Sequence, residues 1–100
     1  MTNYANTSQR SQLIAGLRDL AEYLASNPDV PAPWNGTTVY VFPLIGSNEE
    51  RRAEIDAIAT HVGSQPCEFT PGHYVASRYF GPVEYRAIAI DRDPDESDEE

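Results

Sequence analysis

The first quarter of the chain carries apolar residues at helical spacing. Between Ser8 and Ser26, four leucines are separated by four, three and four positions and so line one stripe of an α-helix: Leu13, Leu17, Leu20 and Leu24. Ser8 or Ser11 is the expected N-cap, because a serine oxygen accepts a hydrogen bond from a free amide of the first turn. The pattern predicts that this helix ends at Asn27, since the ring of Pro28 disfavours helical geometry in the residue before it.

A proline-rich segment, PDVPAPWNG, follows from Pro28 to Gly36. Its closely spaced prolines favour an extended, stiff conformation. A short run of this kind beside an aromatic residue fits a ligand for a proline-recognition module. It also fits a rigid connector whose tryptophan, Trp34, docks on the protein's own core, and we favour this second interpretation.

The middle of the chain predicts a strand and then a second helix. Thr37 to Phe42 (TTVYVF) is β-branched or aromatic throughout, and its apolar character on both faces favours an interior strand. Residues 47–50 (SNEE) fit a capping box at the start of a helix. The helix is expected to bury residues at the spacing i, i+3, i+4 and i+7 and to end at Gly63: Ile55, Ile58, Ala59 and Val62.

The last third of the chain predicts strands over residues 66–69, 73–80 and 83–90. Gly81-Pro82 suits a two-residue type II′ turn between the last two strands. This turn pairs Phe80 with Val83 and assigns the side chains of the hairpin to two faces. One face, which we take as the core face because its alanines allow close approach of helices, holds Tyr74, Ala76, Arg78, Phe80, Val83, Tyr85, Ala87 and Ala89. The other face holds Val75, Ser77, Tyr79, Glu84, Arg86, Ile88 and Ile90.

The element order is therefore α-β-α-β-β-β, which predicts an α+β fold. The simplest two-layer arrangement places two helices on one face of a largely antiparallel four-stranded sheet. We expect residues 1–7 to be frayed, residues 8–90 to form a single domain and residues 91–100 to be a disordered acidic tail.

Charge is distributed unevenly along the 100 residues, whose formal net charge is -9. Residues 91–100 hold seven acids and one arginine, so -7 + 1 = -6, and the remaining ninety residues hold nine acids and six arginines, so -9 + 6 = -3. This balance argues against binding to nucleic acid or to an anionic membrane surface. No apolar run is long enough to span a membrane, and the single cysteine excludes an intramolecular disulfide framework. We therefore expect a cytoplasmic protein.

Few residues suggest catalytic or metal chemistry. Cys67 and His73 lie six positions apart across a turn, and a thiolate–imidazole pair or two metal ligands would fit them together with His61. No zinc-type spacing accompanies them, so we interpret them as a half-buried strand cysteine, a turn histidine and a helix-end histidine. Arg78 on the core face is expected to stack on Tyr85 or Tyr74 or to pair with Asp19 or Glu22. The alternative for Arg78 is an anion contact at the end of the sheet, alongside Arg86. We predict no catalytic residue, metal or cofactor.

The hairpin sequence GHYVASRYFGPVEYRAIAI, together with TTVYVFP and EERRAEIDAIATHVG, resembles a family of small proteins of actinobacteria and their phages. The resemblance covers roughly residues 10–90. It implies a bacterial or phage protein working in the cytoplasm, and it carries over neither catalytic residues nor a cofactor, because the family has no established activity.

These observations favour a non-enzymatic module that binds a protein partner through the outer face of its sheet, with a homodimer as one form. The motivating feature is the apolar content of that face on a chain too small to cover both sides of a sheet. The candidate interaction residues are Tyr79, Glu84, Arg86, Ile88 and Ile90. The alternative is an acidic, phage-type inhibitor that mimics DNA and occupies a host nucleic-acid-binding protein.

Overall fold

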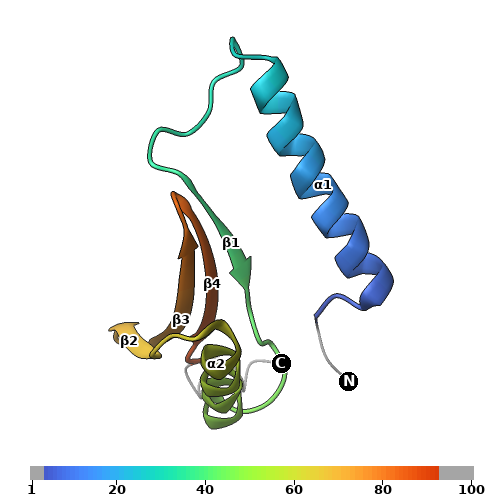
Figure 1. Cartoon of the computed structure of the whole chain (residues 1–100). Coiled ribbons are helices and arrows are strands. Elements are labelled where there is room, and N and C mark those ends of the chain that lie inside the picture. The colour runs from blue at the N-terminus through green and yellow to red at the C-terminus, as the bar shows by residue number, and fades with distance from the viewer. Residues whose placement is uncertain (1–3, 93–100) are drawn as a thin grey trace. The chain divides into compact units, whose positions relative to one another are not determined.

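The computed structural model describes residues 4–92 (Figure 1). Two units make up this part of the chain: a helix unit, Tyr4–Gly36, and a sheet unit, residues 37–92. Their elements follow in the order α1 (Thr7–Ser26), β1 (Thr37–Val41), α2 (Asn48–Val62), β2 (Cys67–Thr70), β3 (His73–Phe80) and β4 (Val83–Ile90). The predicted α+β class and element order are confirmed. The segment expected to form a single domain, residues 8–90, thus consists of two units.

The helix unit holds α1 and the proline-rich segment. The N-cap of α1 is Asn6, which forms a capping box with Gln9, so the prediction of a serine cap is wrong. The amide side chain of Asn6 performs the same function two residues before Ser8. The helix ends at Ser26, as the following Asn-Pro pair predicts. Trp34 is 94% exposed, so the prediction that the tryptophan docks on the protein's own core is wrong.

The sheet has the strand order β1-β4-β3-β2. Two of its pairings, β2 with β3 and β3 with β4, are antiparallel, whereas β1 runs parallel to β4, so the sheet is mixed. The prediction of an interior position for residues 37–42 is wrong, because β1 is an edge strand. Its apolar residues differ in burial on the two faces of the strand. Val39 and Val41 on one face are half-buried, and Tyr40 on the other face is exposed.

The β3–β4 hairpin has the register predicted from its turn. Gly81 adopts a φ of 60°, the left-handed conformation that such a turn requires. Phe80 pairs with Val83, and Ser77 pairs with Arg86. The assignment of side chains to the two faces of the hairpin is therefore confirmed.

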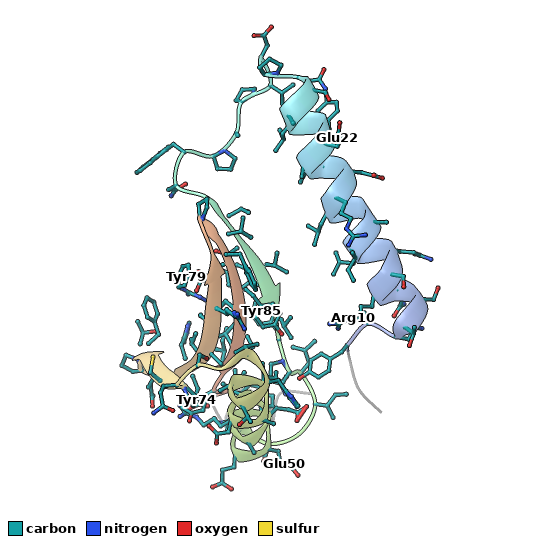
Figure 2. All side chains as sticks on the ribbon, in the orientation of Figure 1. Arg10, Glu22, Glu50, Tyr74, Tyr79 and Tyr85 are labelled. Carbon is teal, nitrogen blue, oxygen red and sulfur yellow. The ribbon has the colours of Figure 1, made fainter. Side chains whose placement is uncertain are left out.

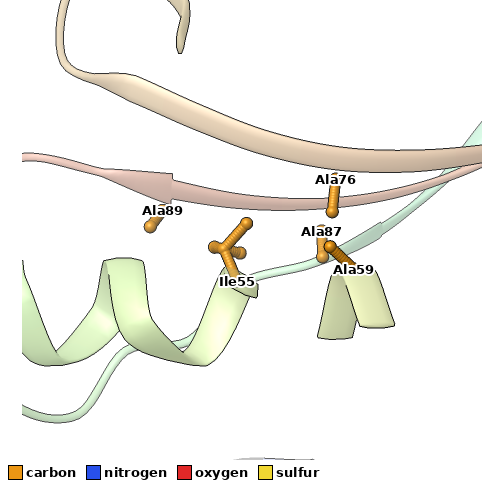
Figure 3. Packing of buried hydrophobic residues seen from close by; sticks show 5 residues of the cluster. All are labelled: Ile55, Ala59, Ala76, Ala87 and Ala89. Atoms are coloured by element: carbon orange, nitrogen blue, oxygen red, sulfur yellow. The ribbon is translucent and has the colours of Figure 1, made fainter. Parts of the chain in front are cut away.

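Helix α2 covers the face of the sheet that carries the alanines. Ile55 and Ala59 of α2 pack against the small side chains Ala76, Ala87 and Ala89 (Figure 3). Alanines on the strands allow the helix to approach closely, and Ile55 is the one large side chain of the described residues that is fully buried. The position of α1 on this same face stays a prediction.

The ends of α2 are capped as predicted. Ser47 and Glu50 form the capping box at its start, and Gly63 adopts the left-handed conformation at its end with a φ of 74°. At the N-terminal end the buried guanidinium of Arg51 donates to the carbonyls of Gly46 and Ile90 and to the side chain of Asn48. These contacts fix the start of α2 to the end of β4.

The first two residues of the predicted acidic tail belong to the fold. Asp91 accepts two hydrogen bonds from the guanidinium of Arg52, at 3.1 Å and 2.9 Å. The backbone of Arg92 exchanges hydrogen bonds with the side chain of Asn48. The rest of the predicted tail, residues 93–100, lies outside the described residues, as do residues 1–3 of the predicted frayed N-terminus.

Candidate functional site

The candidate site is the outer face of the sheet, which we define as the face opposite α2. Because strand residues alternate between faces, the residues on either side of Ala87, which packs against α2, point to the outer face. Strand pairing then places Tyr40 and Ser77 beside Arg86, and Thr38 and Tyr79 beside Glu84. Figure 2 shows Tyr79 and Tyr85 on opposite sides of the two central strands.

A partly buried ion pair lies at the centre of the outer face. The carboxylate of Glu84 accepts hydrogen bonds from Nε of Arg86 at 2.8 Å and from its NH2 group at 3.3 Å. The hydroxyls of Ser77, at 2.8 Å, and Thr38, at 3.3 Å, donate to the same carboxylate. Three strands therefore contribute to one hydrogen-bond network. The network satisfies polar groups that would otherwise be partly buried without hydrogen-bond partners.

The electrostatics of the network keep Glu84 ionised. Burial by itself raises the pKa of the Glu84 carboxyl, but the hydrogen bonds from Arg86 and Ser77 and the charge of Arg86 outweigh burial, so the pKa is lowered from its ordinary value. The pKa of Arg86 is raised, chiefly by its hydrogen bond to Glu84 and in smaller part by one to Tyr79. The pair is thus ionised on both sides and carries no net charge.

Aromatic side chains surround this ion pair. The guanidinium of Arg86 lies over the ring of Phe69, 5.1 Å from its centroid. On the other side, Tyr40 stacks on Phe42 with centroids 5.6 Å apart and an interplanar angle of 13°. Tyr40, Phe42, Phe69 and Tyr79 are all exposed. The outer face therefore combines a hydrogen-bonded centre of no net charge with an apolar and aromatic border.

The five predicted interaction residues occupy different depths on this face. Tyr79 and Ile90 are exposed, and Arg86 is half-buried. Glu84 is only 6% exposed and Ile88 only 5%, so both are buried beneath the exposed side chains of this face and offer little surface to a partner. Sequence reasoning missed Tyr40, Phe42 and Phe69, because their place on the outer face depends on the pairing of β1 with β4 and of β2 with β3.

The other residues singled out in the sequence lie apart from this site or at its border. Cys67 is exposed on β2, which differs from the half-buried position expected for it, because β2 is an edge strand. His61 lies in the last turn of α2, as expected, and His73 begins β3. Within residues 4–92, no three side chains of the metal-ligating types gather in one place.

Arg78 has a structural contact that differs from the expected ones. Its guanidinium donates to the carbonyl of Val62 at 3.4 Å and lies over the ring of Phe80, 5.4 Å from the centroid. The expected stacking on Tyr74 is wrong, because the guanidinium of Arg52 lies over the ring of Tyr74 and the hydroxyl of Tyr74 donates to Asp56. The expected contacts of Arg78 with Tyr85, Asp19 or Glu22 stay predictions. Arg78 thus places a positive charge at the C-terminal end of α2, where the helix dipole favours it.

Comparison with known proteins gives no family assignment. No protein-family model matches the chain, and neither a curated protein nor a solved structure matches it. In the part of the chain that the structure describes, no helix has the length and apolar character needed to cross a membrane.

Proposed function

We propose that this protein is a small, non-enzymatic interaction module of bacterial or phage origin that works in the cytoplasm. Its outer face binds the apolar side chains of a protein partner. The observation that carries this proposal is the set of four exposed aromatic rings, Tyr40, Phe42, Phe69 and Tyr79, around one partly buried ion pair. Tyrosine and arginine are enriched among the residues that contribute most to protein–protein binding, and phenylalanine is enriched in the cores of such interfaces.

The neutral charge of the face supports a protein partner rather than a nucleic acid. A sheet that stacks single-stranded RNA or DNA on aromatic rings also needs cations for the phosphates. The cation at the centre of this face, Arg86, is paired with Glu84 at 2.8 Å. The net charge of the sheet unit points the same way: seven acids and five arginines over residues 37–92 give -7 + 5 = -2.

Affinity capture with a matched pair of variants tests the proposal. Tyr79→Ser removes a ring from the outer face, where Tyr79 is 63% exposed, and Phe80→Ser removes a ring from the opposite face, where Phe80 is 58% exposed. Wild-type protein and both variants are immobilised, and the proteins retained from a bacterial extract are quantified by mass spectrometry. We expect a partner that the wild type and Phe80→Ser retain equally and that Tyr79→Ser retains at least about tenfold less.

Two results would contradict the proposal. One is a set of retained proteins that is the same for all three baits. The other is a partner that Phe80→Ser loses and Tyr79→Ser keeps, which would move the binding surface to the face that carries α2.

The alternative, a DNA mimic that occupies a host nucleic-acid-binding protein, is supported by the acidic C-terminal sequence. Six of the sixteen acids of the chain lie in residues 93–100. Deletion of residues 93–100 separates the two functions: a partner that binds the shortened protein as well as the full chain favours the outer face, and a partner lost with the deletion favours mimicry.

A further inference from the structure

The apolar stripe of α1 has no partner within the helix unit. No residue of α1 is buried. The leucines at the centre of the stripe, Leu13, Leu17 and Leu20, are 44% to 53% exposed. The helices of folded proteins gain most of their stability from burying such a stripe rather than from helix propensity.

We propose that α1 pairs with α1 of a second copy of this chain, and that the two helices run antiparallel. The leucines follow the seven-residue repeat of a coiled coil: Leu17 and Leu24 occupy one of its two core lines, and Leu13 and Leu20 occupy the other. An antiparallel pair centred between Arg18 and Asp19 brings Leu13 against Leu24 of the second copy and Leu17 against Leu20. The same contacts recur on both sides of the two-fold axis, so the assembly closes at two copies.

The charges of α1 favour the antiparallel orientation. Arg10 continues the core line of Leu17 and Leu24, so a parallel pair would place two Arg10 side chains against each other. In the antiparallel pair Arg10 instead lies beside Asn27 of the second copy, at the C-terminal end of its helix. The last turn of α1 contains no basic residue of its own, so the negative end of its helix dipole favours this cation.

Gly16 gives the pair room along one side. A Cβ added at Gly16 would meet no atom within 4 Å, so nothing in the described chain requires a glycine there. Gly16 and Tyr23 flank the stripe on the same side. In the proposed pair the ring of Tyr23 of the second copy lies beside Gly16, where the missing side chain leaves space.

Sedimentation of the full chain over a concentration series tests the pairing. Leu17→Asp places a charge in the core of the pair, and Ala15→Asp places the same charge on the opposite side of the same helix. We expect a dimer for the wild type and for Ala15→Asp, and a dissociation constant at least roughly 100-fold higher for Leu17→Asp. A wild type that stays monomeric at millimolar concentration overturns the proposal. So does a dimer that survives Leu17→Asp and dissociates with Tyr79→Ser, which would place the contact on the outer face.

Disulfide trapping tests the orientation without a destabilising charge. In a Cys67→Ser background, protein with Leu13→Cys is mixed with protein carrying Leu24→Cys and oxidised. In the antiparallel pair these two positions meet, whereas two copies of position 13 are separated by eleven residues, or about 16.5 Å along the helix axis at a rise of 1.5 Å per residue. A disulfide needs Cα atoms within about 7 Å. We expect mixed disulfides only. Disulfides between identical variants would show a parallel pair and overturn the proposal.

Discussion

The substitution Glu84→Ala tests the role of the partly buried ion pair in the fold. It removes the acceptor of four hydrogen bonds and leaves the guanidinium of Arg86, whose side chain is 19% exposed, without its carboxylate. A hydrogen bond to a charged group contributes about 1.5–3 kcal/mol, and all four of these bonds go to the ionised carboxylate, whose burial offsets part of their sum. Because Arg86 retains some access to water, we expect a loss of about 2–4 kcal/mol.

This loss is large for a unit of this size. The sheet unit has 56 residues (92 - 36), for which a stability of about 3–8 kcal/mol is typical. Glu84→Ala is therefore expected to leave it marginally folded. The double variant Glu84→Leu with Arg86→Met removes both charges and fills part of the space, so we expect it to be more stable than the single variant.

Amide hydrogen exchange measures these losses directly. The amides of Ala76 and Ala87 lie in the centre of the sheet and report on opening of the sheet unit. A cost below about 0.5 kcal/mol for Glu84→Ala would refute the reasoning, because surface substitutions commonly cost that little. A double variant less stable than the single one would also refute it.

Three further predictions concern the sheet unit. Because Ile55 is fully buried, Ile55→Ala should lower the free energy of unfolding measured in urea by about 2–5 kcal/mol, and Ile55→Val should lower it by only about 0.5–1.5 kcal/mol. Equally small losses for both variants would contradict the packing described. Gly63→Ala should cost about 1–2 kcal/mol through backbone strain alone, because its φ is 74° and no atom lies within 4 Å of an added Cβ; an unchanged unfolding midpoint would contradict this. The folded pKa of Glu84 lies below its ordinary value, so its contribution is complete above about pH 4.3 and is lost as the pH falls through the folded pKa. The urea midpoint of the wild type should therefore fall more steeply below that pH than the midpoint of Glu84→Gln, and parallel curves would contradict this.

Local signals in the sequence were sufficient for the hairpin and for α2. Gly81-Pro82 fixes the register of β3 and β4 because few residues other than glycine adopt the positive φ of such a turn. The Ser47 capping box and Gly63 define α2 by contacts within one turn of each helix end. In each case the residues that decide the structure are neighbours in the chain.

Contacts between distant segments were beyond the reach of these signals. The edge position of β1 depends on its parallel pairing with β4, more than forty residues later, and apolar residues on both faces suggested an interior strand instead. The same long-range pairing brings Tyr40 to the outer face, and the pairing of β2 with β3 brings Phe69 there. The sequence therefore identified Tyr79 and Arg86 as surface candidates but not the aromatic residues around them.

Site-specific photo-crosslinking in living cells tests the central claim, that the outer face is the contact surface. A photoreactive phenylalanine analogue replaces Tyr79 in one variant and Phe80 in another, so that the same probe projects from opposite faces of one strand. The account predicts a covalent adduct with a protein partner from position 79 and none from position 80. Adducts from position 80 alone, or from neither position, would contradict it.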